Sequence, residues 1–321
     1  MSYKMLCVTL TPTLDRKVVI KNFEPGRFFR IVDHADSFVE PGGKGINVAV
    51  LLSDFKISSV NMGFLGGSIG SIIQSKLSLY GNITTQFVYI EEETRENIII
   101  IDPDNRTLSE INLNGPEISQ SDMDYFTSRY RSTLNLVDNV VVSGLIPRGI
   151  TLNSYANLFR MAKAMNKKTY IEAIGEHFDN VVTNSCPMIV RPDLRKSNLL
   201  FGQPLKEDIQ EYMKAGSFII SRGAELVIMS YKTVSDIIVT KNGGWIFTAK
   251  GEIDPAKVKN SGDAFMSGMI YHNIVNGFEP FEAARYGMAF ALNSTRYISK
   301  KVGSIEEINK SLDDFTIERI G

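Results

Sequence analysis

The chain has 321 residues, of which 43% are hydrophobic and 22% are charged, as in an ordinary globular protein with a large core. Its 35 basic and 36 acidic residues leave a formal net charge of -1, so no overall positive charge attracts a nucleic acid or an anionic membrane. Small molecules are therefore the expected partners, with no nucleic acid and no membrane.

The first residues and the cysteines favour a cytoplasmic protein. The stretch MSYKMLCVTLTPTLD is too short and too interrupted by threonine for a signal peptide, and no run of 18 apolar residues follows it. Cys7 and Cys186 lie far apart, without the spacing of a zinc site. We expect both to be reduced and buried.

Short β-rich runs alternate with longer runs of helical spacing along the chain. The β-rich runs are residues 5–10, 59–66, 138–144, 167–174, 187–193 and 225–230. The helix-like segments between most of them are residues 46–55, 71–80, 121–136, 154–165 and 207–219. This alternation predicts an α/β fold, with helices on both faces of a mostly parallel central sheet.

Two regions interrupt the alternation. Residues 17–39 and 84–113 are strand-rich, alternate with period two and contain no helix-like segment. We expect them to form a small inserted β-sheet, with boundaries near 14–40 and 84–113. Because open α/β sheets bind ligands at the carboxyl ends of their strands, this sheet would act as a lid. No linker or repeat divides the chain, so residues 1–321 are expected to form a single domain.

Two glycine-rich turns open helix-like segments. PGGKGIN at 41–47 lacks the spacing of a P-loop. GFLGGSIG at 63–70 lacks the GxGxxG of a dinucleotide fold, which disfavours a nicotinamide-dependent oxidoreductase. Bare backbone at a helix start suits an anion or a sugar hydroxyl, and it equally suits a tight turn with no other role.

A third turn, KVKNSGDAF, places Asn260, Ser261, Gly262 and Asp263 at the start of an amphipathic helix. An aspartate in the first turn can simply be a cap. It can also take a proton from a hydroxyl while neighbouring N–H groups hold the charge of a phosphoryl group in transfer. One turn would then supply both a base and an anion hole.

Nine short segments occur in the order that one known family has them. They are TLTPTLD (9–15), PGGKGINVA (41–49), GFLGG (63–67), TREN (94–97), SEINLNGPEIS (109–119), VSGLIPRGI (142–150), VRPD (190–193), SRGAE (221–225) and NSGDAF (260–265). Through them the chain resembles the PfkB family of carbohydrate kinases, and within it the 1-phosphofructokinase and tagatose-6-phosphate kinase branch. The resemblance implies a ribokinase-like three-layer sandwich with an inserted lid.

The resemblance also implies a substrate site. Positions matched to substrate binding are Asp15, Gly42, Gly43, Lys44, Asn47, Arg95 and, more weakly, Arg30. Short polar groups beside bare backbone suit sugar hydroxyls. Lys44 and Arg95 match the cations that bind the phosphate already on the substrate, a task that suits an ammonium and a planar guanidinium.

The same resemblance implies catalytic and nucleotide sites. Asp263 matches the catalytic base, and the backbone of Ser261, Gly262 and Asp263 matches the anion hole, in a catalytic turn that begins at Asn260. Positions matched to ATP binding are Asp193, Ser221, Gly223 and Asn293. Mg²⁺ would bridge the ATP phosphates without a direct protein ligand, with water near Asp193 as its closest link to the chain.

Several nucleotide-side positions depart from the family pattern. Asn260 stands at a usual glycine, KPNxxE reads RPDLRK with Asp193 and Lys196 at its last two conserved positions, and SRGAEL is matched to SxGxxG. Two interpretations follow, a working kinase or a sugar-phosphate-binding or sensing protein that has lost efficient transfer. Intact Gly262 and Asp263 favour the working kinase. The resemblance then implies conversion of fructose 1-phosphate to fructose 1,6-bisphosphate, with tagatose-6-phosphate kinase as the alternative. Family lids often pair, so a homodimer through the lid is expected.

Overall fold

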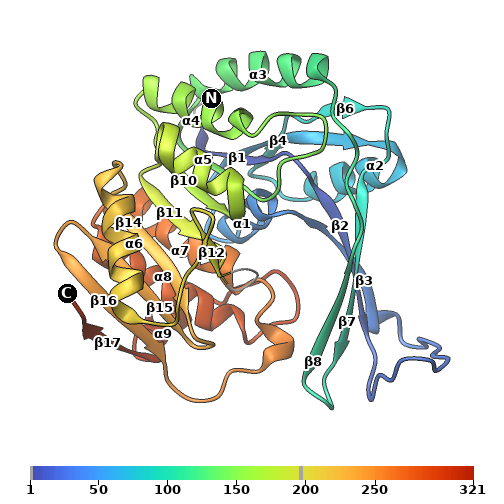
Figure 1. Ribbon diagram of the computed structural model, residues 1–321. Helices are drawn as coiled ribbons and strands as arrows, with labels where there is room; N and C mark the ends of the chain where they lie inside the picture. The colour runs from blue at the N-terminus through green and yellow to red at the C-terminus, as the bar shows by residue number, and fades with distance from the viewer. Residues whose placement is uncertain (1–2, 195–197) are drawn as a thin grey trace.

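The computed structural model describes residues 3–194 and 198–321, and it has a three-layer α/β body with a smaller sheet beside it (Figure 1). The central sheet has the order β17-β16-β15-β14-β11-β10-β9-β1-β4-β5, with β6 beside β4. Its strands are β1 (Tyr3–Thr9), β4 (Ser59–Gly66), β5 (Ile83–Thr85), β6 (Val88–Ile90), β9 (Val137–Ser143), β10 (Lys168–Ala173), β11 (Ile189–Pro192), β14 (Leu226–Tyr231), β15 (Ser235–Thr240), β16 (Gly243–Ala249) and β17 (Phe315–Arg319).

Neighbouring strands from β5 to β14 in this order are parallel, and those from β14 to β17 are antiparallel. The parallel strands are joined through crossover helices, as parallel pairing requires. The predicted mostly parallel sheet is therefore confirmed. A short hairpin of β12 (Leu199–Leu200) and β13 (Gln203–Pro204) lies apart from it.

Helices cover both faces of the central sheet. One face carries α1 (Lys44–Ser53), α2 (Gly67–Leu77), α7 (Ser261–Asn276), α8 (Pro280–Ser294) and α9 (Ile305–Ser311). The other carries α3 (Gln120–Leu134), α4 (Asn153–Ala164), α5 (Gly175–Ser185) and α6 (Ile209–Ser221). Strand β1 shows how the sequence supports this: Met5 and Cys7 point into the first apolar layer, whereas Leu6 and Val8 point into the second.

The smaller sheet is the expected lid. It has the order β3-β2-β7-β8, with β2 (Thr13–Val19), β3 (Ser37–Gly42), β7 (Arg95–Asp102) and β8 (Thr107–Asn112), and a 3₁₀ turn η1 (His34–Asp36) precedes β3. It extends away from the body in Figure 1. Residues 83–90, which overlap the second predicted lid segment, instead form β5 and β6 beside β4 in the central sheet.

One face of the lid rests on the C-terminal part of the body. Ile99 and Ile101 of β7 are buried with Ala256 in a small apolar cluster. Ala256 belongs to the 3₁₀ turn η2 (Pro255–Lys257), which directly precedes α7. Nearby, Arg106 pairs with Glu252 at 2.6 Å. The lid thus contacts the segment that leads into the aspartate-bearing turn.

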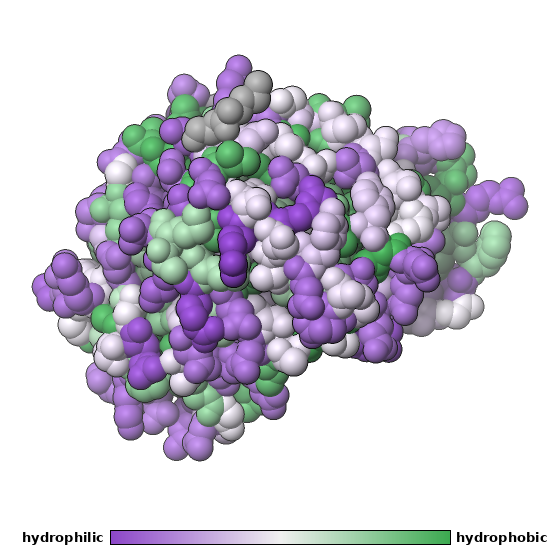
Figure 2. Space-filling view, turned by 90° about the horizontal axis from the view of Figure 1, so that it is seen from above, coloured by the Kyte–Doolittle hydropathy of each residue, from purple (hydrophilic) through white to green (hydrophobic). Residues whose placement is uncertain are grey.

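The face of the molecule seen in Figure 2 is mostly polar, and the two cysteines are buried. Hydrophilic and weakly polar residues cover most of the face seen from above, with hydrophobic ones scattered among them (Figure 2). None of the helices among residues 3–194 and 198–321 is long and apolar enough to cross a membrane. Cys7 and Cys186 are free and buried, as expected, and burial raises the pKa of both thiols, that of Cys186 to about 11.

Candidate active site

A pocket of about 430 Å³ lies where the lid meets the carboxyl ends of the central strands. Ligands of open α/β sheets bind at this edge. Its lining residues are Thr9, Thr11, Thr13, Asp15, Gly43, Lys44, Asn47, Arg95, Asn97, Glu110, Asn112, Gly144, Leu145, Glu172, Ala173, Ile174, Arg191, Asp193, Val258, Lys259, Asn260, Gly262 and Asp263. Most of these side chains are polar or charged, which suits a hydrophilic ligand better than an apolar one.

Strand ends and helix starts bring these side chains together. Strand β1 ends at Thr9, Glu172 is one residue from the end of β10, and Asp193 directly follows β11. Helix α1 begins at Lys44, and α7 begins at Ser261. Both helix N-termini therefore meet the pocket, with first-turn N–H groups that have no partner inside the helix.

The first turn of α7 has no space for a side chain at position 262 while Glu172 and Arg191 stay in place. A Cβ added there would come within 2.8 Å of Glu172 Oε1 and 2.9 Å of Arg191 Nη1. Asn260 is the N-cap residue, with φ -98° and ψ 6°, and its side chain makes no capping hydrogen bond. A buried carboxylate and guanidinium thus lie directly against the bare backbone of the turn.

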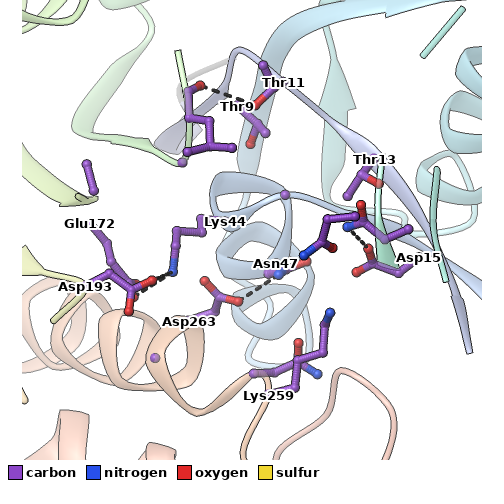
Figure 3. A pocket seen from close by; sticks show the side chains of 18 of the residues that line it. Thr9, Thr11, Thr13, Asp15, Lys44, Asn47, Glu172, Asp193, Lys259 and Asp263 are labelled. Atoms are coloured by element: carbon purple, nitrogen blue, oxygen red, sulfur yellow. Dashed lines mark hydrogen bonds and ion pairs between the residues drawn. The ribbon is translucent and has the colours of Figure 1, made fainter. Parts of the chain in front are cut away.

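Asp263 lies in the first turn of α7 and lines the pocket. Its Oδ2 accepts a hydrogen bond of 2.7 Å from Asn47 Nδ2, and in the described part of the chain its buried Oδ1 has no hydrogen-bond partner (Figure 3). Burial raises the pKa of Asp263 to about 6, although the Lys44 ammonium opposes this shift. A buried acceptor with a pKa near neutrality has the properties of a general base.

Lys44 reaches from α1 toward the central sheet (Figure 3). Its Nζ is 2.8 Å from Glu172 Oε1 and 3.1 Å from Asp193 Oδ2. Burial would lower the pKa of the ammonium, but Glu172, Asp263 and Asp193 outweigh burial and raise it. Arg191, 1% exposed, donates to the same Glu172 oxygen at 2.7 Å. Lys44 therefore belongs to a buried ion network beside Asp263.

Asp15 of β2 faces the pocket from the lid. Its Oδ1 accepts from Asn97 Nδ2 at 3.0 Å, and its Oδ2 accepts from Lys300 Nζ at 2.9 Å. Gly42 supports this arrangement without lining the pocket, since a Cβ there would lie 2.6 Å from Asp15 Oδ2. The carboxylate is thus held in place by donors on two sides.

Two further cations line the lid side of the pocket. Arg95 begins β7 and donates to Asn97 Oδ1 and to the Leu113 carbonyl, both at 3.4 Å. Lys259, just before the α7 turn, pairs with Glu110 of β8 at 2.7 Å. The structure therefore assigns Lys44 to the body side and Arg95 to the lid side, rather than placing them as one pair.

Two residues predicted to bind nucleotide lie elsewhere. Ser221 ends α6, and Gly223 follows it in the loop that enters β14. This loop is at the amino end of β14, the edge of the sheet opposite the pocket. The prediction for Ser221 and Gly223 is wrong, because SRGAEL precedes the strand instead of following it. The turn after β14, residues 232–234, lies at the pocket's edge of the sheet.

Two more predicted residues do not reach the pocket. Asn293 is fully buried, and its Oδ1 accepts from the Gly303 backbone at 2.7 Å, so its side chain holds the loop before α9 and is not available to a nucleotide. Arg30 is exposed in the loop between β2 and η1 and does not line the pocket. Lys196 lies outside the described residues.

The pocket contains residues that sequence reasoning missed. Glu172, Arg191, Lys259 and Asn97 line it, and Lys300 reaches Asp15 from behind. Glu172 and Arg191 left a signal, since each is a charged residue directly after apolar residues of a buried strand. Buried charges of this kind require a partner. Lys259 and Lys300 left no signal in the sequence, because the role of each arises from contact with a lid strand that is distant along the chain.

The carboxylates of the body side are the groups that could hold Mg²⁺. Magnesium prefers oxygen ligands and usually keeps several waters. In the part of the chain that the structure covers, no group of three or more His, Cys, Asp or Glu could bind a metal directly. Glu172 Oε2 is buried there without a hydrogen-bond partner, and Asp193 lines the pocket. These two residues fit an ion held through water.

Comparison with known proteins gives concordant results. The family described as pfkB family carbohydrate kinase matches residues 29–301. The chain is 28% identical over 316 residues to 1-phosphofructokinase of Bacillus subtilis (strain 168), covering 98% of this chain and 99% of that protein.

Solved structures agree with this. A Thermotoga maritima protein named a possible 1-phosphofructokinase has 38% identity and a TM-score of 0.95, covering 99% of this chain and 100% of that one. Phosphofructokinase-2 of Escherichia coli, in complex with potassium, has 20% identity and a TM-score of 0.84, covering 98% and 99%. The second similarity concerns the fold alone.

Proposed function

Because the chain belongs to the PfkB family of carbohydrate kinases, we propose that it is a 1-phosphofructokinase, which transfers the γ-phosphoryl group of ATP to fructose 1-phosphate. The observation that carries this proposal is the polar pocket between Asp263 and Asp15, together with full-length similarity to the B. subtilis enzyme. The product would be fructose 1,6-bisphosphate.

The transfer step is assigned to the N-terminus of α7. Asp263 Oδ1 takes the proton of the attacking hydroxyl, while Asn47 holds the other carboxylate oxygen. The N–H groups of Gly262 and Asp263 face the phosphoryl group in transfer, whose negative charge the helix dipole also favours, whereas the Ser261 N–H donates to the Val258 carbonyl at 3.0 Å. Lys44, beside Asp263, adds a positive charge to the same region. Positioning and charge neutralisation supply most of the catalysis in such a reaction.

The lid side is assigned to the sugar phosphate. Asp15 and Asn97 present oxygen and nitrogen atoms that suit sugar hydroxyls, and Gly43 leaves its backbone open beside them. Arg95 is the cation on this side that suits the substrate's phosphate. The family resemblance assigns both Lys44 and Arg95 to that phosphate. In the structure Lys44 instead lies with Glu172 and Asp193, beside the proposed base Asp263.

Mg²⁺ would neutralise charge on the ATP phosphates. Glu172 and Asp193 are the residues we propose to hold it through water. The nucleotide itself would approach over the turn at residues 232–234, because this turn follows β14 at the edge of the sheet that bears the pocket. We place the reaction in the cytoplasm.

We also propose a homodimer through the lid. The outer face of the lid carries Ile98, Ile100 and Ile111, and Ile111 is 52% exposed. The loop between β2 and η1 adds Phe28, which is 86% exposed. Neighbouring apolar side chains that reach the surface, as Ile98, Ile100 and Ile111 do on one face of the β7–β8 pair, mark interaction surfaces.

The test is ADP release with Mg-ATP against fructose 1-phosphate, tagatose 6-phosphate, fructose 6-phosphate and the unphosphorylated sugars. Turnover of fructose 1-phosphate well above the others supports the proposal. Preference for tagatose 6-phosphate would replace the substrate and keep the reaction class. Binding of a phosphosugar by calorimetry without any turnover would instead mark a sensing protein.

A further inference from the structure

The segment between α8 and α9 reaches across to the base of the lid. Lys300 Nζ donates to Asp15 Oδ2 at 2.9 Å and to the Pro41 carbonyl, and the Lys300 backbone N–H donates to Glu40 Oε1 at 3.2 Å. Beside it, Lys17 Nζ donates to the Ile298 carbonyl at 2.7 Å. Four hydrogen bonds thus join residues 298–300 to strands β2 and β3.

The contact between Lys300 and Asp15 is buried. The Lys300 side chain is 2% exposed and that of Asp15 is 4% exposed. A buried ammonium is costly unless it is paired, so its location needs a reason. Asp15 lines the pocket, whereas Lys300 is not among the lining residues. Lys300 can therefore influence a ligand only through the groups that it holds.

The hydrogen bonds fix the orientation of the Asp15 carboxylate. Asn97 donates to Oδ1, and Lys300 donates to Oδ2. Each oxygen keeps a further lone pair, so the carboxylate can still accept hydrogen bonds from a ligand. Burial alone would raise the pKa of Asp15, but Lys300, then Lys259, and hydrogen bonds outweigh it and lower the pKa. The group therefore remains an ionised acceptor.

Other charged groups also face Asp15, and each has a different main partner. Lys17 of β2 pairs with Glu40 of β3 at 2.7 Å. Lys259 pairs with Glu110, and Arg95 of β7 donates to Asn97 and a carbonyl. Among the described cations, Lys300 is the one in an ion pair with Asp15.

We propose that Lys300 is a positioning residue for the sugar site: it orients Asp15 to accept hydrogen bonds from hydroxyls of the sugar phosphate, and so sets sugar affinity without taking part in transfer. This inference rests on the proposed kinase function. It also means that the segment after α8, remote from Asp15 in sequence, completes the sugar site.

The first test replaces Lys300 with methionine, which keeps the length of the stem and removes the charge. Losing a hydrogen bond to a charged group predicts a rise of about 10-fold to 100-fold in KM for fructose 1-phosphate. The KM for ATP and kcat should change by less than about threefold, because transfer itself is untouched. The matched control is Lys301→Met, an exposed neighbour stacked near Tyr297, which should leave all three constants unchanged.

A double-mutant cycle shows whether Lys300 acts through Asp15. In an Asp15→Asn background, Lys300→Met should raise the sugar KM no further. The double variant leaves no unpaired buried charge, so it provides the comparison even if Lys300→Met alone fails to fold. Additive effects, or equal rises in both KM values, would make Lys300 a merely structural residue and overturn the proposal.

Carbon-13 NMR titration of the aspartate carboxyls gives a readout that needs no turnover. Asp15→Asn assigns the Asp15 signal, which should titrate at a higher pH in Lys300→Met than in the unmodified chain. An unchanged titration would overturn the role of Lys300. An unmodified protein that turns over no sugar phosphate, with the Asp15 titration still shifted by Lys300→Met, would overturn the proposed reaction and support the contact.

Discussion

At the residue scale, Asp263 shows most clearly how burial and chemistry are linked. Its carboxyl group is buried at a helix start, with one oxygen held by Asn47. We expect Asp263→Asn to lower kcat by at least about 10²-fold to 10⁴-fold, the usual loss for a positioned base. Binding of fructose 1-phosphate by calorimetry should persist. The control is Asp138→Asn on the exposed side of β9. Retention of more than a few per cent of activity would remove Asp263 from this role.

The raised pKa of Asp263 also predicts how the stability of the fold changes with pH. Because the folded pKa of about 6 lies above the ordinary value, ionisation is disfavoured in the folded state. Stability from this group is fully present below about pH 4, the ordinary range for aspartate, and is lost as the pH rises through about 6. Asp263→Asn should therefore raise the Tm at pH 8 by a few degrees and have little effect at pH 4, as calorimetry can measure. A lower Tm for the variant at pH 8 would contradict this.

The same group predicts a pH dependence for activity. As pH falls through about 6, Asp263 becomes protonated and can no longer accept the proton of the attacking hydroxyl. A profile of kcat/KM for fructose 1-phosphate from pH 4.5 to pH 8 should show its acidic limb near that value, because kcat/KM reports the pKa of the enzyme before the sugar phosphate binds. A limb that persists unchanged in a weakly active Asp263 variant would assign it to another residue.

Gly262 sets the distance between the α7 turn and the buried charges behind it. We expect Gly262→Ala to lower kcat by at least about 10²-fold, since the added Cβ would meet Glu172 and Arg191 at under 3 Å and displace the anion-binding backbone. Gly81→Ala is the matched control, because a Cβ there meets nothing within 4 Å. Steady-state kinetics of both variants, with circular dichroism to check folding, decide the point. Equal activity of the two variants would contradict the role of the turn.

At the element scale, the lid has one face on the body and one outside. Ile99 and Ile101 point toward η2, whereas Ile98, Ile100 and Ile111 point outward. We expect the chain to sediment as a dimer and Ile111→Lys to sediment as a monomer, because a buried lysine would oppose pairing of two lids. Tyr125→Lys, an exposed aromatic on α3, is the control. A monomeric unmodified chain would exclude the lid dimer.

The helices and strands also show which turns at the pocket can be predicted from sequence patterns. The turns at Lys44 and at Gly262 were predicted because glycines and helical spacing are adjacent in the sequence. SRGAEL has a similar glycine, but it lies between α6 and β14 and so at the wrong end of the strand. A local motif fixes a turn, and only the direction of the neighbouring strand decides which edge of the sheet that turn occupies.

At the scale of the whole molecule, the lid and the catalytic turn are mechanically joined. Ala256 packs with Ile99, and Lys259 pairs with Glu110. We expect fructose 1-phosphate to slow hydrogen exchange both in β7–β8 and in residues 252–259, because a ligand between them stabilises both. Helix α3, on the far face, should be unaffected. Slowing in the lid alone would show that the two segments move independently.

The fold could be predicted from the sequence more completely than the site. Alternating β-rich and helical runs, interrupted by two strand-rich regions, suffice for the sandwich and the lid. Most predicted substrate and catalytic residues line one pocket, because they lie in turns at strand ends. Lys259 and Lys300 were missed, since their roles arise from contacts with Glu110 and Asp15, far away in sequence. Such contacts leave no local pattern.

The two buried thiols have a practical consequence. Because Cys7 and Cys186 are enclosed and their pKa values are raised, maleimide dyes should react slowly with the native chain. Single cysteines introduced on the lid and on α3 would then be labelled almost without background. Energy transfer between two such dyes would show, in single molecules, whether the lid changes its distance from the body during turnover.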